Sequence, residues 1–471
     1  MKNNLLKNLS ANTLQLVINQ LSGLVIFYIL SSGLDKNSFG QLNLSLAILL
    51  VVFNLLSLGI EQVAIRKIAS GGPAHFILSF YLFHVIITGA LFYGLLLIGS
   101  LFINQQNGLY PLLLLIGLGK LVIYFSTPFK QIASGLERFR TLALMLITSN
   151  VVRSIALMVI TLLHILSLQI TIIIFIAGDI LELALCIYLF KRSAGVPVSV
   201  SYNRTAYLAL LRESLPQMGV TLITSAMARF DWIFIGFILS AIKLAEYSFA
   251  YKVFEMSTLP LLAIAPILLP WFTRLFKHTV TDTTNLKLLL KVEMIIASLT
   301  ILLLNMLWVP VIDRVTAGRY GAVNVNTIFI LTLCIPFLYL NNFLWTINFA
   351  LGHTKMILTG FIITLLVNVG LDILLIPFFK NEGAAAAFLT ASLVQGIFYL
   401  YKTPITGFNS NLINLLVCTL CAVISGAITK TYISDYYLST GLAVFLFFIL
   451  LLLTTQIRLA DITGIRKLLA V

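Results

Sequence analysis

Long apolar segments recur along the whole 471-residue chain, and they constrain its fold more than any other feature. Each is about twenty residues long, the length that a helix needs to cross a hydrocarbon core of roughly 30 Å. Only 10% of the residues are charged and 60% are hydrophobic, whereas a soluble domain carries about 25% charged residues. The alternating ten-residue strands of a membrane barrel are not seen. The sequence therefore predicts an all-α polytopic membrane protein.

The apolar runs between charged or Gly/Pro-rich breaks predict about fourteen transmembrane helices. They are expected near 9–31, 40–61, 75–101, 109–128, 141–164, 169–190, 210–239, 244–272, 289–311, 324–351, 355–378, 383–402, 411–430 and 437–457. The first run is too long for a signal-peptide core and should remain as a span. We expect a six-helix bundle in 1–192, a cytoplasmic linker in 193–209, a second six-helix bundle in 210–403, and two additional helices with a cytoplasmic tail in 404–471.

The distribution of Lys and Arg predicts the orientation of the chain. With the amino terminus inside, twenty basic residues, Lys130 among them, lie in cytoplasmic loops, and six lie on the opposite side. This excess predicts that both termini are cytoplasmic. The net charge of +14 is then a topology signal, and no nucleic-acid partner is expected. No outer loop reaches twenty residues, which disfavours an extracytoplasmic catalytic domain.

The two halves of the chain echo one another. Phe39-Gly40-Gln41, after the first span, corresponds to Glu246-Tyr247-Ser248 after the seventh, and Ser134-Gly135 corresponds to Leu351-Gly352. Both echoes run in the same chain direction after six spans, which indicates a parallel repeat about an axis along the membrane normal. Two such bundles are expected to flank a central cavity and to alternate access by rocking.

Three segments resemble one family. These are FGQLNLSLAILLVVFNLLSLGIEQVAIRKIA from Phe39, AEYSFAYKVFEMSTLPLLAIAPILLP from Ala245 and, most specifically, NVGLDILLIPFFKNEGAAAAFLTASL from Asn368. They are similar to the polysaccharide (Wzx-like) flippases of the multidrug/oligosaccharidyl-lipid/polysaccharide (MOP) exporter superfamily. The family often has Gly at the positions of Glu246 and Ala386.

This resemblance implies a V-shaped transporter in a bacterial inner membrane. Its substrate would be an undecaprenyl-pyrophosphate-linked oligosaccharide, moved to the outer leaflet for O-antigen or capsule assembly, with contact to a polysaccharide polymerase and chain-length machinery expected. A peptidoglycan-precursor flippase, a multidrug efflux transporter and, in a different class, a membrane-embedded polysaccharide polymerase remain alternatives.

Four basic residues fall inside predicted spans, and we take them as candidates for a cationic, substrate-binding cavity. An ionised side chain near the bilayer centre costs roughly 2.5–3.5 kcal/mol, so such groups face a cavity or a partner. Basic side chains suit a pyrophosphate because they donate charge-assisted hydrogen bonds to its oxygens. Lys252 also has a local alternative, an ion pair with Glu255 three residues on. The candidates are Lys120, Arg153, Arg229 and Lys252.

Acidic residues inside the spans are candidates for coupling transport to a proton or sodium gradient. Asp179 and Glu182 share one helix face, where repulsion would favour proton exchange; the equal alternative is that they pair with Arg153 or another cation. The remaining candidates are Asp231, Glu255 and Asp372. Pro216 and Pro260 are candidate gating bends.

No enzymatic activity, metal or cofactor is expected. The five histidines are scattered, no phosphate-binding glycine loop is found, and the four cysteines lie in apolar segments without a second pair of metal ligands.

Overall fold

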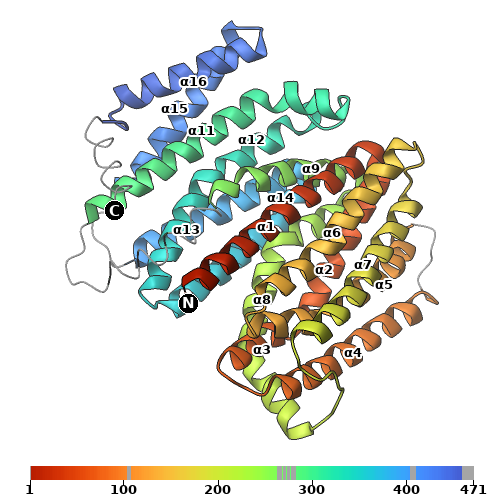
Figure 1. The fold of residues 1–471 in the computed structure, drawn as a ribbon. Coiled ribbons are helices and arrows are strands. Elements are labelled where there is room, and N and C mark those ends of the chain that lie inside the picture. The colour runs from red at the N-terminus through yellow and green to blue at the C-terminus, as the bar shows by residue number, and fades with distance from the viewer. Residues whose placement is uncertain are drawn as a thin grey trace. The chain divides into compact units, whose positions relative to one another are not determined.

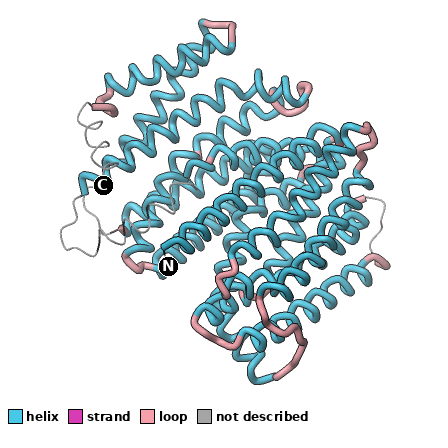
Figure 2. Tube along the Cα trace, in the orientation of Figure 1, coloured by secondary structure: helices cyan, strands magenta, loops and turns pink. Residues whose placement is uncertain are grey.

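All regular elements in the described part of the chain are helices (Figures 1 and 2). The computed structural model describes residues 2–102, 108–261, 283–403 and 410–458, together with Leu268, Phe272 and Phe276. The helices up to residue 238 are α1 (Lys2–Gly33), α2 (Lys36–Leu56), α3 (Ile60–Ala69), α4 (Ala74–Gly99), α5 (Leu109–Gly135), α6 (Phe139–Leu162), α7 (Leu168–Ser193) and α8 (Arg204–Ile238). They are followed by α9 (Ala241–Ser257), α11 (Thr283–Thr316), α12 (Val325–Leu333), α13 (Ile335–Ala350), α14 (Thr354–Lys402), α15 (Ser410–Tyr432) and α16 (Tyr436–Leu453), with a 3-10 turn, η2 (Ala322–Asn324), before α12.

The prediction of about fourteen membrane helices is confirmed. Twelve helical stretches of the described residues are long and apolar enough to cross a membrane. One of them, α14, is two spans, because Lys380 leaves the helical region with φ 53° and ψ −131°. The predicted span 244–272 begins in α9, and its last part lies mostly outside the described residues.

Side-chain caps set where several helices begin. The Asp35 carboxylate accepts the Ser38 amide at 2.9 Å at the start of α2. Ser167 caps α7 and Ser240 caps α9 in the same way. Each cap satisfies one of the amides that the first turn of a helix leaves without a partner. Polar residues at the span boundaries therefore fix the helix starts.

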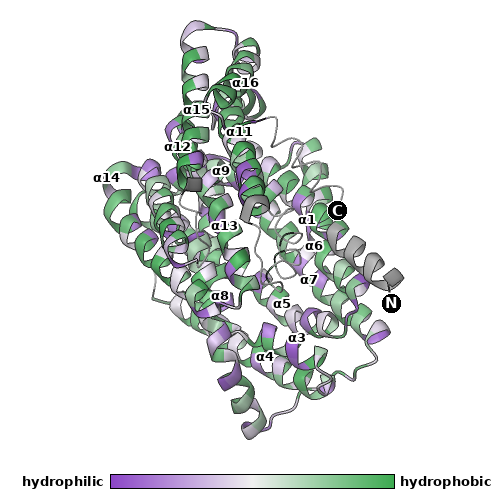
Figure 3. Cartoon of the chain, turned by 90° about the vertical axis from the view of Figure 1, so that its left-hand side faces the viewer, coloured by the Kyte–Doolittle hydropathy of each residue, from purple (hydrophilic) through white to green (hydrophobic). Residues whose placement is uncertain are grey.

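The helices expose apolar surface of the kind that a bilayer covers. Leu91, Leu95 and Leu366 are each more than 60% exposed in mid-helix, and hydrophobic residues predominate along the helices (Figure 3). A soluble monomer rarely exposes so much contiguous apolar surface. The chain is a multi-pass membrane protein.

The structure divides into two compact units, unit 1 (Met1–Gly236) and unit 2 (Phe237–Val471). In unit 1, α1 packs on α6, and α5 packs on α7 and α4. In unit 2, α11 packs on α13, α15 and α16. Nearly all of α8 belongs to unit 1, where the Asn54 amide donates to the Ser225 hydroxyl at 2.7 Å. The bundles and linker expected at 1–192, 193–209 and 210–403 stay a prediction.

The turns after α5 and α13 share one hydrogen-bond pattern, which also ends α3, α6, α11 and α16, so the predicted repeat stays a prediction. After α5, the Arg138 amide donates to the Ala133 carbonyl at 2.9 Å, with Glu137 at φ 57°. After α13, the His353 amide donates to the Asn348 carbonyl at 2.9 Å, with Gly352 at φ 79°. Both are left-handed helix ends of the Schellman type. The fourth and tenth spans thus end alike.

Small residues permit close helix packing in the second half of α14. Ala384, Ala385 and Ala387 are fully buried, and a Cβ at Gly383 would lie 2.5 Å from the Leu375 carbonyl oxygen. Gly383–Ala387 is therefore a close-packing surface.

Candidate functional site

An ion pair lies inside unit 1, between α6 and α7. The Arg153 guanidinium donates to the Asp179 carboxylate, and it also donates to the Phe175 carbonyl at 3.3 Å. The side chains of Arg153 and Asp179 are 8% and 3% exposed. The pairing alternative for Asp179 is therefore confirmed, and Arg153 is compensated by an acid.

A second buried pair joins α5 to α7. The Lys130 amine donates to the Glu182 carboxylate, with side-chain exposures of 9% and 7%. The assignment of Lys130 to a cytoplasmic loop is wrong, because α5 continues through Pro128 to Gly135. Membrane helices tolerate an internal proline where neighbours satisfy the backbone. Glu182 lies one helical turn from Asp179, and the sequence indicated that both acids could have cationic partners. It did not indicate that Lys130 is the partner of Glu182.

Two glycines allow the three helices to approach at these pairs. A Cβ at Gly119 on α5 would lie 2.5 Å from Oδ2 of Asp179. A Cβ at Gly178 on α7 would lie 3.0 Å from Cγ of Arg153. Any larger residue would push the charged groups apart.

Lys120 lies next to this cluster without a partner of its own. It follows Gly119 on α5 and is half-buried, within electrostatic reach of Arg153, Lys130 and Glu182. Within the described ranges, no hydrogen bond or ion pair to Lys120 is found. Since the two acids of α7 are each taken by another base, Lys120 is the uncompensated cation of the cluster.

Arg229 on α8 is the second sequence candidate without an acidic partner among the described residues. One of its Nη atoms donates to the Ala228 carbonyl at 2.7 Å, and its guanidinium carbon lies 4.5 Å from the Trp232 ring centroid. Asp231 is buried, and its carboxylate accepts the Trp232 amide at 2.8 Å. As expected from the two-residue spacing, Asp231 does not form an ion pair with Arg229.

The remaining sequence candidates lie in unit 2. Lys252 and Glu255 on α9 form the local ion pair that was the alternative for Lys252, at 2.7 Å and with side-chain exposures of 24% and 43%. Asp372 is fully buried in α14, where it accepts the Asn368 amide at 3.2 Å. The substrate and ion-coupling roles of these residues stay predictions.

One buried acid was not singled out from the sequence. Glu293 on α11 is 2% exposed, and neither of its carboxyl oxygens has a hydrogen-bond partner. The apolar residues at helical spacing around Glu293 could have indicated from the sequence that it is buried. In the described part of the chain, no three His, Cys, Asp or Glu side chains are grouped to hold a metal ion.

The fold is that of a known class of membrane transporters. It superposes on the lipid II flippase MurJ in an inward closed conformation with a TM-score of 0.75 and 14% identity, over 93% of this chain and 97% of that one. An inward-facing multidrug resistance MATE transporter of the MOP superfamily gives 0.64 and 15%, over 85% and 97%. A MATE transporter from Vibrio cholerae gives 0.56 and 16%, over 84% and 96%. The chain has the MOP superfamily fold, as the resemblance implied.

A sequence match identifies the family of this chain within that class of transporters. The family model described as "Polysaccharide biosynthesis protein" matches residues 5–276, more than half of the chain. The comparison with curated proteins gives no match. The chain belongs to the polysaccharide biosynthesis protein family.

Proposed function

We propose that this protein is a flippase for an undecaprenyl-pyrophosphate-linked oligosaccharide repeat unit. It moves the repeat unit from the cytoplasmic to the outer leaflet of a bacterial inner membrane by alternating access, for O-antigen or capsular polysaccharide assembly. Lys120, an uncompensated cation beside two buried ion pairs in a polysaccharide biosynthesis family member, carries the proposal. The protein acts as a transporter and not as an enzyme.

The charge of the candidate site favours an anionic substrate. Lys120 and Arg229 are half-buried and have no acidic partner in the described residues. Holding a cation in a low-dielectric surrounding costs free energy that an anionic ligand offsets. A pyrophosphate supplies several acceptor oxygens, and each charge-assisted hydrogen bond contributes about 1.5–3 kcal/mol. A few such contacts hold the ligand while still allowing its release.

The ion pairs of Arg153 and Lys130 suit a supporting role. Each pair joins a basic residue of α5 or α6 to an acidic residue of α7. In each pair, the basic side chain can exchange its acidic partner for another anion. We propose that the pyrophosphate competes with Asp179 for Arg153 when it reaches Lys120. Arg153 would then contact substrate for only part of the cycle, and Asp179 would become available to a coupling ion.

Two alternatives share this fold. A peptidoglycan-precursor flippase is favoured by the likeness to MurJ, whose name states lipid II as its substrate. A multidrug exporter of cationic compounds is disfavoured by Lys120 and Arg229, which would repel such a substrate. The family match supports sugar-repeat export over both.

The test is made in cells that depend on this gene for surface polysaccharide, at matched protein levels. With Lys120→Met or Arg229→Gln, we expect surface display to fall and lipid-linked repeat units to accumulate on the cytoplasmic side. Lys191→Met, at an exposed position, is the matched control and should behave like the wild type. Normal display in both variants contradicts the proposal, and accumulation of peptidoglycan precursors instead favours the first alternative.

A further inference from the structure

Glu293 occupies a position on α11 that the surrounding sequence reserves for apolar side chains. Leu286, Leu290, Ala297 and Ile301 lie on one helical stripe with Glu293, at intervals of three or four residues, and each of these four is at most 1% exposed. Such a stripe packs against neighbouring helices. Glu293, in the middle of it, is 2% exposed. The carboxyl therefore lies on a packed face of α11, shielded from water.

No group in the described structure compensates a charge at this carboxyl. Neither oxygen of Glu293 accepts or donates a hydrogen bond, and no ion pair reaches it. Lys291 is two residues away on α11 and so lies on another face. An ionised carboxylate without partners in such a setting is strongly unfavourable, whereas the protonated acid avoids most of this cost.

The helices packed against α11 bring one titratable group near Glu293. Tyr339 on α13 is fully buried, its hydroxyl has no hydrogen-bond partner, and it lies within electrostatic reach of Glu293. The other titratable side chains on the packed helices in the described ranges are Cys418, Cys421, Lys430 and Tyr432 on α15, and Tyr436 and Tyr437 on α16. Glu293 and Tyr339 are thus two buried side chains whose polar atoms have no hydrogen-bond partner in the described structure.

We propose that Glu293 is a proton-carrying residue and that its protonation couples the transport cycle to the proton gradient. The coupling rests on the proposed flippase function. The carboxylate takes up a proton from water to become the neutral acid, and this allows α11 to pack as observed. Release of the same proton to water restores the carboxylate, and the charge then favours a state in which α11 is hydrated. The proton is the only species transferred, and no bond between heavy atoms changes.

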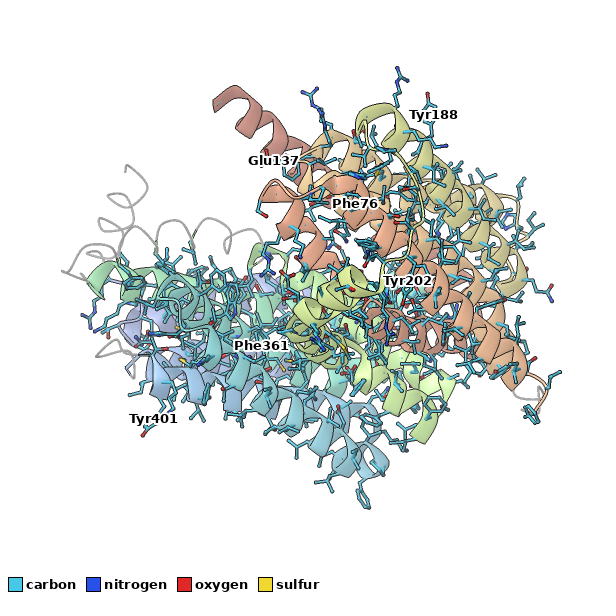
Figure 4. The ribbon with its side chains drawn as sticks, turned by 90° about the horizontal axis from the view of Figure 1, so that it is seen from below. Phe76, Glu137, Tyr188, Tyr202, Phe361 and Tyr401 are labelled. Carbon is cyan, nitrogen blue, oxygen red and sulfur yellow. The ribbon has the colours of Figure 1, made fainter. Side chains whose placement is uncertain are left out.

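The first test needs no transported substrate. Infrared difference spectra of the purified full-length protein are recorded as the pH is raised. We expect the wild type to lose a protonated-carboxyl band that is absent at every pH in Glu293→Gln. Glu137→Gln, the same change at an exposed turn residue (Figure 4), should keep the band. Identical band changes in the wild type and in Glu293→Gln overturn the proposal.

Glu293→Leu is a second variant that controls for a folding defect, because Leu continues the apolar stripe of α11. We expect this variant to be at least as heat-resistant as the wild type and to lack the same band.

The coupling itself is tested in proteoliposomes. A pH gradient should accelerate lipid movement by the wild type severalfold and should not change the rate of lipid movement by Glu293→Gln. An equal acceleration of both overturns the coupling. A wild type that moves no lipid-linked sugar refutes the proposed flippase function, while the infrared result still decides whether Glu293 binds a proton.

Discussion

The Arg153 guanidinium on α6 donates to the Asp179 carboxylate on α7, and both side chains are almost completely enclosed. The pair makes Arg153 a structural element of unit 1 as well as a candidate substrate contact. Loss of activity in Arg153→Ala alone would therefore not identify a binding residue. Variants that keep charge balance are needed.

We predict that breaking this pair destabilises the protein more than replacing it. Asp179→Asn leaves a buried guanidinium without its acid, and we expect a loss of about 3–5 kcal/mol in the free energy of unfolding. The double variant Arg153→Met/Asp179→Leu should recover most of that loss. Unfolding of the purified proteins in detergent measures both. Lys252→Ala, which breaks a partly exposed pair within one helix, should change stability by about 1 kcal/mol or less. A double variant as unstable as the single one contradicts the pairing.

Removing the uncompensated cation should have the opposite effect on stability. Lys120→Met deletes a charge that has neighbouring cations and no partner in the described residues. We expect unchanged or increased heat resistance together with loss of transport, a combination that is typical of functional residues held at a cost to stability. The unfolding midpoint and the transport rate are measured on one preparation. A destabilised Lys120→Met protein would show that the amine has a structural partner.

The glycine at position 119 should be sensitive to a single added methyl group. Gly119→Ala places its Cβ against the Asp179 carboxylate, so we expect a loss of about 1–3 kcal/mol from overpacking. Gly94→Ala in α4 is the matched control, since nothing lies within 4 Å of the added Cβ. That change should stabilise slightly, because Ala favours helix more than Gly by roughly 1 kcal/mol. Equal effects of the two substitutions on the unfolding midpoint would contradict the close approach of α5 and α7.

The cap of α2 provides a pH-dependent prediction. The Ser38 side chain and amide, through their hydrogen bonds, hold the pKa of Asp35 below its ordinary value of 3.8. The carboxylate therefore stabilises the folded state fully above that value, and the contribution is lost as the pH falls through the folded-state pKa. Asp35→Ala should cost about 1 kcal/mol near neutral pH. The difference in unfolding free energy between the wild type and Asp35→Ala should shrink on acidification, and a difference that grows would refute the assignment.

The fold was predictable because hydropathy and the helix period act locally. The apolar runs of about twenty residues and the break at Lys380, which divides α14, can be recognised without tertiary information. The loop assignment of Lys130 failed for the converse reason. A Lys after a Pro is typical of a span boundary, and only the Glu182 carboxylate on another helix allows it to be buried.

The candidate site was only partly predictable, because pairing depends on which helices meet. The sequence indicated that Arg153 and Asp179 need compensation, but contact between α6 and α7 decides that they compensate each other. Because the same contacts pair both acids of α7 with other bases, Lys120 has no acidic partner in the described residues. Glu293 is the opposite case, since its lack of partners is visible only when every neighbouring helix is in place.

The most direct test of the flippase function is a lipid-movement assay with the purified protein. The full chain is reconstituted into vesicles with a polyprenyl-pyrophosphate-linked oligosaccharide, and its arrival in the outer leaflet is followed with an impermeant sugar-modifying reagent. We expect movement by the wild type and by Lys191→Met, and movement slower by about tenfold or more in Lys120→Met, in keeping with the loss of one charge-assisted contact. A wild-type protein that leaves the lipid-linked oligosaccharide in its original leaflet would contradict the account.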